Sequence, residues 1–102
     1  MERKGRRQKS EVSNLNHALS YWRTKSGQEV NFIVGDAETA IEVKGAARVD
    51  QADLRGLAAF SEEYKPRRAL LVCNESTPRQ AGKILVLPWR IFMEKLWSGE
   101  II

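Results

Sequence analysis

Several residue types are scarce in this 102-residue chain, and each scarcity excludes a class of protein. A single cysteine, Cys73, rules out a disulfide within the chain and favours a reducing, cytoplasmic environment. The single histidine, His17, has no second histidine or cysteine near it in the sequence, which argues against a zinc site. No apolar run reaches the roughly 18 residues that a membrane-spanning helix needs, so we expect no membrane partner.

A phosphate-binding loop of the P-loop type is also missing. The nearest candidate, "TPRQAGKI", has Thr77 at the position of the first glycine, and Ile84 stands where a serine or threonine must follow Lys83. We therefore expect no ATP hydrolysis by a P-loop mechanism.

Positive charge is concentrated at the N-terminus of a chain whose net charge is +4. Because residues 1–10 have almost no apolar side chains to bury, we expect a basic, disordered tail there, followed by a single domain over 11–102. The tail could contact nucleic-acid phosphates, with Arg6 and Arg7 as candidates, or it could simply be solvated. Both interpretations stay open.

The spacing of apolar residues predicts the order of the elements. It places helices at 11–20, 51–64 and 89–97, strands at 21–25, 28–34, 38–44, 68–73 and 83–87, and a polar loop at 75–82. The first three strands are joined by short turns, which predicts an antiparallel meander. The helix before the fourth strand predicts a parallel crossover. We therefore expect an α/β fold with a mixed sheet flanked by helices.

The second and third predicted strands bring polar side chains together. Side chains alternate along a strand, so Glu42 and Lys44 share a face about 6.6 Å apart. Glu29 and Asn31 share a face of the preceding strand in the same way. The short "GDAE" connection should place Asn31 near Glu42.

This grouping suits the hydrolysis of phosphodiesters. Carboxylates hold Mg²⁺ or Mn²⁺, which polarises the phosphate and activates a water molecule, and a neighbouring lysine stabilises the negative charge that develops. The spacing of Glu42 and Lys44 alone, however, favours a simple ion pair on a solvated sheet face.

A resemblance to a known family runs over about residues 15–102. It is carried by four segments in order, "YWRTKSGQEVNFIV", "AIEVKG", "DLRGLAAF" and "ILVLPWRIFMEKLWSGEII". Together they resemble the C-terminal domain of a large group of prokaryotic AAA-type ATPases. That domain is a family of unknown function assigned to the PD-(D/E)xK superfamily, whose restriction-endonuclease-like fold has an αβββαβ core.

The resemblance implies roles for individual residues. Glu42 would be the metal-binding acid and Lys44 the catalytic lysine. Position 31 is where the family usually has an aspartate as its first metal ligand, and this chain has Asn31. Loss of that charge should weaken binding of Mg²⁺ or Mn²⁺ substantially. Glu29, one pleat away with a longer side chain, is the candidate to replace it.

The resemblance also implies partners. We expect a nuclease-like domain associated with nucleic acid, with Arg23 and Lys25 as further candidate backbone contacts, and with weak or lost phosphodiester hydrolysis. The alternative is a catalytically inactive adaptor that binds DNA or an AAA-type ATPase, since the ATPase module itself is missing from the chain. No heptad pattern predicts an oligomeric state.

Overall fold

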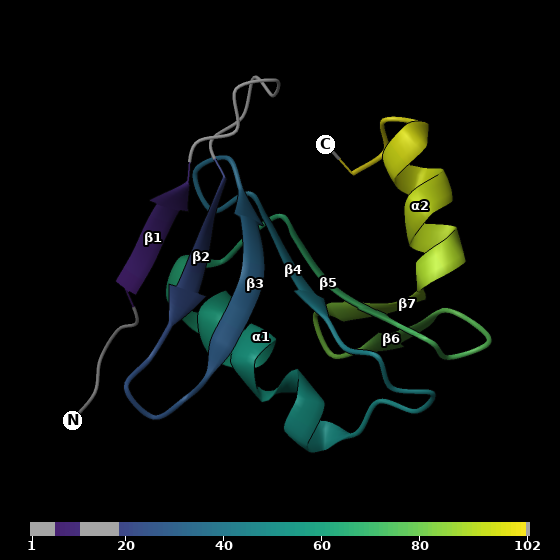
Figure 1. Ribbon diagram of the computed structural model, residues 1–102, viewed down its shortest axis with the longest axis horizontal. Coiled ribbons are helices and arrows are strands. Elements are labelled where there is room, and N and C mark those ends of the chain that lie inside the picture. The colour runs from purple at the N-terminus through teal and green to yellow at the C-terminus, as the bar shows by residue number, and fades with distance from the viewer. Residues whose placement is uncertain (1–5, 11–18, 102) are drawn as a thin grey trace.

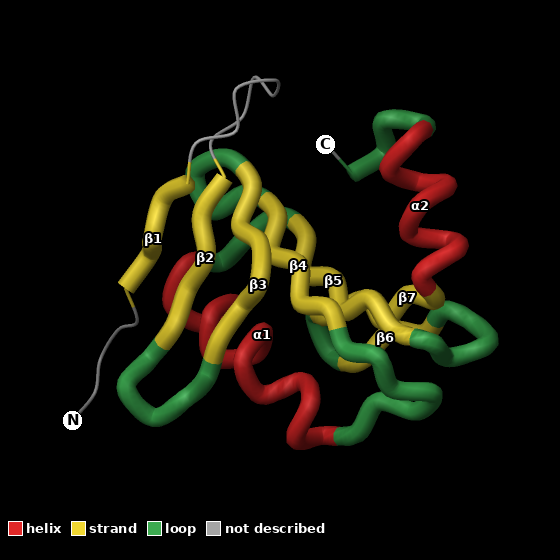
Figure 2. The backbone as a smooth tube through the Cα atoms, viewed as in Figure 1, coloured by secondary structure: helices red, strands yellow, loops and turns green. Residues whose placement is uncertain are grey.

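A seven-stranded sheet, with one helix against each of its faces, forms the fold (Figures 1 and 2). The computed structural model describes residues 6–10 and 19–101. The strand order is β1-β2-β3-β4-β5-β7-β6. The elements are β1 (Arg6–Ser10), β2 (Leu19–Arg23), β3 (Glu29–Val34), β4 (Thr39–Val43), α1 (Gln51–Tyr64), β5 (Arg68–Cys73), β6 (Arg79–Ala81), β7 (Ile84–Pro88) and α2 (Trp89–Trp97).

The sheet is antiparallel at both ends and parallel in the middle. Strands β1 to β4 pair antiparallel in sequence order, β4, β5 and β7 are parallel, and β6 returns antiparallel to β7. Helix α1 makes the crossover from β4 to β5. It begins at Asp50, which forms a reciprocal capping box with Asp53, and it ends where Lys65 adopts a left-handed conformation with φ of 50°.

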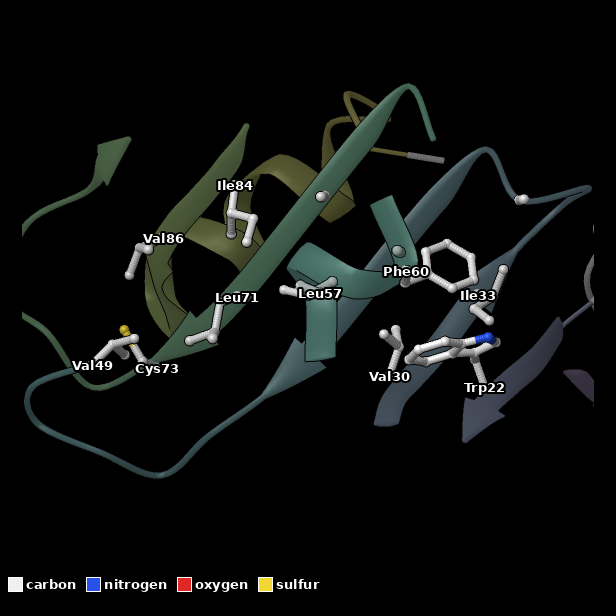
Figure 3. Close-up of a cluster of buried hydrophobic side chains, with 13 residues drawn as sticks. Trp22, Val30, Ile33, Val49, Leu57, Phe60, Leu71, Cys73, Ile84 and Val86 are labelled. Atoms are coloured by element: carbon white, nitrogen blue, oxygen red, sulfur yellow. The ribbon is translucent and has the colours of Figure 1, made fainter. Parts of the chain in front are cut away.

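Helix α1 covers the first face of the sheet and builds the larger part of the core. Phe60 lies edge-on to Trp22, with ring centroids 5.6 Å apart, and Leu57 is completely buried (Figure 3). Gly56 brings the helix so close to β3 that a Cβ atom there would collide with the Glu29 carbonyl. The backbones of α1 and β3 are therefore in direct contact at this point.

Helix α2 covers only part of the second face. Its side chains Ile91, Phe92 and Leu96 pack on a cluster that includes Leu70 and Leu87, from β5 and β7.

In the part of the chain that the structure describes, no helix is long and apolar enough to cross a membrane.

These elements confirm the predicted α/β class, with its mixed sheet and flanking helices. Helices α1 and α2 and strand β5 have the predicted bounds, and β2, β3, β4 and β7 differ from them by one or two residues at their ends. The predicted first helix is different. Residues 11–18 lie outside the described residues, while Leu19 and Ser20 belong to β2, where they pair with Val34 and Ile33.

Two segments predicted to lack regular structure contain strands. Residues 6–10 of the predicted disordered tail form β1, which pairs with β2 along its whole length, and residues 1–5 lie outside the described residues. Strand β6 lies inside the predicted loop 75–82 and pairs with β7. Both are edge strands, held by backbone hydrogen bonds to a neighbour, so they need no apolar pattern of their own.

Candidate functional site

Strand β3 contains one more residue than its partner requires. Ser20 of β2 pairs with Ile33, but Trp22 pairs with Val30, so the register shifts between the two pairs. Val30 and Ile33 are three residues apart, yet both are completely buried in the core under α1. Asn31 lies in the resulting β-bulge. Bulges bend a strand, redirect its side chains and are common beside functional sites.

The backbone pairing of β3 with β4 ends at the bulge. The last pair is Phe32 with Ile41. Beyond it, the backbone N–H of Asn31 donates to Oε1 of Glu42 at 2.9 Å, and the backbone N–H of Val43 donates to Oδ1 of Asn31 at 2.8 Å. The side chains of Asn31 and Glu42 thus accept the hydrogen bonds that backbone pairing no longer provides here, and they connect β3 to β4.

Glu42 is a buried carboxyl group, only 4% exposed. Burial raises its pKa above the ordinary value, and the nearby charge of Glu29 acts in the same direction. The N–H of Asn31 and the ammonium group of Lys44, whose Nζ lies 3.7 Å from Oε2, oppose that rise without cancelling it. Both carboxyl oxygens of Glu42 therefore already face a donor from the protein.

Glu29 forms its ion pair with Arg23 of β2. Its Oε2 lies 3.6 Å from Nη2 of Arg23, and the Arg23 guanidinium lies 5.8 Å from the centre of the Tyr21 ring. The structure thus places Asn31, Glu42 and Lys44 together, with Glu29 at the margin. Their catalytic and metal-binding roles stay predictions.

This donor set does not fit a tight magnesium or manganese site. Such ions prefer anionic oxygens, but Glu42 is the only carboxylate in the Asn31–Glu42–Lys44 group, and the Asn31 oxygen already accepts from Val43. Lys44 adds a positive charge where a cation would lie. Among the residues that the structure describes, no group of three or more His, Cys, Asp or Glu side chains is placed to hold a metal ion.

The candidate nucleic-acid contacts gather at one end of the β1–β2 hairpin. Arg6 pairs with Arg23, and Arg7 pairs with Trp22. Lys25 follows in the turn that connects β2 to β3. The pairing of β1 brings residues that are 17 positions apart in the sequence, Arg6 and Arg23, side by side. No local sequence signal indicated this, because it depends on the register between two segments.

One comparison with known proteins identifies a family. The model of a domain of unknown function (DUF4143) matches residues 5–92, which run from just before β1 into α2. The chain belongs to the DUF4143 family. No curated protein and no solved structure matches the chain. The membership agrees with the predicted resemblance to a family of unknown function.

The DUF4143 domain has a second polar feature that the sequence did not indicate. A cavity of about 650 Å³ lies between the start of α1 and the loop after β5. At its wall, Glu75 accepts from the backbone N–H of Val49 at 2.7 Å and pairs with Arg79 through two bonds of 2.9 and 3.0 Å. Arg79 also donates to the Val49 carbonyl at 2.9 Å. The hydrogen bonds from Arg79 and Val49 lower the pKa of Glu75 to about 2. The Glu75–Arg79 pair, through its bonds to Val49, therefore holds the loop before α1 against the loop after β5.

Proposed function

We propose that this DUF4143 domain is a nucleic-acid-binding domain with a nuclease-like, PD-(D/E)xK ancestry, and that its metal-dependent hydrolysis of phosphodiesters is weak or lost. Its relationship would be to the C-terminal module of prokaryotic AAA-type ATPases. Support comes from the order of β2, β3, β4, α1 and β5 and from the Glu42–Lys44 pair at the end of β4, beside position 31 of β3.

The observation that carries the proposal is the exchange of hydrogen bonds between Asn31 and Glu42 across the β3–β4 gap. A hydrolase of this type needs carboxylates free to hold a divalent cation. Here an amide occupies one of the two positions and serves as a crosslink, and Lys44 neutralises the remaining carboxylate. The hydrogen bonds between β3 and β4 at this point therefore favour a structural role for Asn31 and Glu42 over a catalytic one.

Binding to nucleic acid is supported by charge. The chain carries 17 lysines and arginines against 13 acidic residues. At one end of the β1–β2 hairpin the backbone of Arg6 pairs with that of Arg23, and Lys25 follows Arg23 by two residues. Positive side chains gathered in this way neutralise phosphates and release counterions, which makes affinity depend on salt rather than on base sequence.

The test combines a cleavage assay with a binding assay. We expect little or no conversion of supercoiled plasmid by the purified chain in Mg²⁺ or Mn²⁺. Binding to a labelled duplex should weaken with salt. The double variant Arg6→Gln, Arg7→Gln keeps the residues of β1 that pair with β2, and it should make the slope of log affinity against log salt shallower by about 0.9 for each phosphate that is no longer neutralised. Nicking that disappears in Lys44→Ala would establish an active nuclease, and failure to bind any nucleic acid at low salt would refute the proposal.

The second candidate is an inactive adaptor for an AAA-type ATPase. It is favoured by a stripe of exposed apolar side chains at helical spacing on α2, formed by Trp89, Met93 and Trp97, the last of them 82% exposed. Such a stripe suits a groove on a protein partner. A chain that binds no nucleic acid but co-elutes with an AAA-type ATPase, and loses that partner in Trp97→Ser, would select this candidate.

A further inference from the structure

Part of the second sheet face carries exposed aromatic side chains. Phe32 pairs with Ile41, which belongs to the cluster beneath α2, so Phe32 lies on the same face of the sheet as that helix. Tyr21 lies between Ser20 and Trp22, whose side chains are both buried, and therefore points to the face opposite Trp22. Tyr21 is 40% exposed and Phe32 is 44% exposed.

The two rings lie on adjacent strands at the bulge. The register between β2 and β3 shifts at Tyr21, directly opposite the bulge that contains Phe32. Val43, 49% exposed, continues this apolar surface onto β4, two residues beyond Ile41. We call the surface formed by Tyr21, Phe32 and Val43 the aromatic platform. Among the described residues, α2 makes its main contacts with the sheet at β5 and β7.

Charge borders the aromatic platform on one side. The guanidinium of Arg23 lies over the Tyr21 ring, 5.8 Å from its centre. The backbone of Arg6 pairs with that of Arg23, and β1 continues with Arg7. The acid on this side, Glu29, is already paired with Arg23. A ligand on the platform would therefore meet flat apolar rings beside a basic border.

We propose that the aromatic platform binds single-stranded nucleic acid, with unpaired bases stacked on Tyr21 and Phe32 and phosphates toward the basic end of the β1–β2 hairpin. This rests on the proposed function and adds the substrate class to it. Aromatic rings on a sheet stack exposed bases of any sequence, whereas the bases of a duplex are already stacked on one another. Charge alone would not distinguish the two forms.

The experiment compares labelled oligo(dT) of 15 nucleotides with a 15-base-pair duplex, by fluorescence anisotropy at one salt concentration. We expect the affinity of the full chain for oligo(dT) to fall at least about 5-fold in Tyr21→Ser or Phe32→Ser and about 30-fold in the double variant. Affinity for the duplex should stay unchanged. Tyr21→Phe keeps a ring and should bind as the parent does. Trp97→Ser removes an exposed aromatic away from the platform and should have no effect.

Thermal unfolding of each variant establishes that it is folded before binding is measured. If the parent binds oligo(dT) and the double variant binds it equally well, the inference fails while the proposed function stands. If the parent binds neither strand nor duplex, the proposed function fails with it. If the double variant instead loses self-association in sedimentation and keeps its affinity for oligo(dT), the platform is a contact between copies of the chain, which also overturns the inference.

Discussion

Replacing Asn31 by aspartate tests the site most directly. Asn31 and Glu42 bridge the same gap between β3 and β4, with the Asn31 N–H on Oε1 of Glu42 and the Asn31 oxygen on the N–H of Val43. Aspartate has the same shape and can still accept from Val43. The change Asn31→Asp therefore keeps the geometry and adds one negative charge beside a carboxyl group that is already buried.

The cost of that charge follows from the distance between the strands. Two carboxylates about 5 Å apart, the spacing of neighbouring strands, repel by about 3 kcal/mol at an effective dielectric constant of about 20. A proton on Glu42 relieves the repulsion, and its pKa is already raised in the parent. A carboxyl group with a raised pKa keeps its proton in the folded state at pH values where the unfolded chain has lost it, so stability falls as the pH rises through that range.

Urea unfolding at pH 5 and pH 8 measures the effect. We expect Asn31→Asp to be less stable than the parent by up to about 3 kcal/mol at pH 8 and by less at pH 5, because a carboxyl group with a raised pKa holds its proton more often at the lower pH. Mn²⁺ should recover stability in this variant, by about 2.7 kcal/mol at 100 times its dissociation constant. Asn31→Ala is the matched control: loss of the acceptor for Val43 should cost about 1 kcal/mol, with no recovery by metal.

The result that would refute this reasoning is equally specific. If Asn31→Asp has the same stability relative to the parent at pH 5 and pH 8, the two side chains do not share the gap electrostatically. If Mn²⁺ stabilises the parent as much as the variant, the asparagine is no obstacle to metal binding. Position 31 would then not be the reason for weak hydrolysis, and Glu29 would become the candidate for the second carboxylate.

Two further predictions concern the scaffold around the site. Gly56→Ala should destabilise the domain by about 1–3 kcal/mol, because the new methyl group would force α1 away from the Glu29 carbonyl; an unchanged urea midpoint would contradict the close approach. Glu75→Gln should lower the melting temperature at pH 7, because the lowered pKa of Glu75 stabilises the folded state there. The difference in melting temperature between variant and parent should shrink as the pH falls from 4.5, the ordinary pKa of a glutamate carboxyl group, toward about 2, the pKa of Glu75 in the folded protein, since this stabilisation is lost over that range. A pH-independent difference would show that the charge on Glu75 is unimportant.

Local patterns in the sequence determined the types and the order of most elements. Helical spacing marks α1, and a continuous apolar run marks β5, because each reports the burial of a single segment. Strand alternation likewise indicated that Glu42 and Lys44 lie on one face, and their side chains do pair, at 3.7 Å. These features depend on residues close together in the sequence, so they could be read without a structure.

The tertiary structure decided the features that depend on how distant segments align. The pairing of β1 with β2, the bulge in β3 and the crosslink between Asn31 and Glu42 all require a register between strands, which no single segment encodes. Periodicity could not reveal the bulge because one inserted residue breaks the alternation on which periodicity relies. The sequence thus indicated that Asn31 lies near Glu42. Only the pairing of β3 with β4 showed that Asn31 connects the two strands through hydrogen bonds.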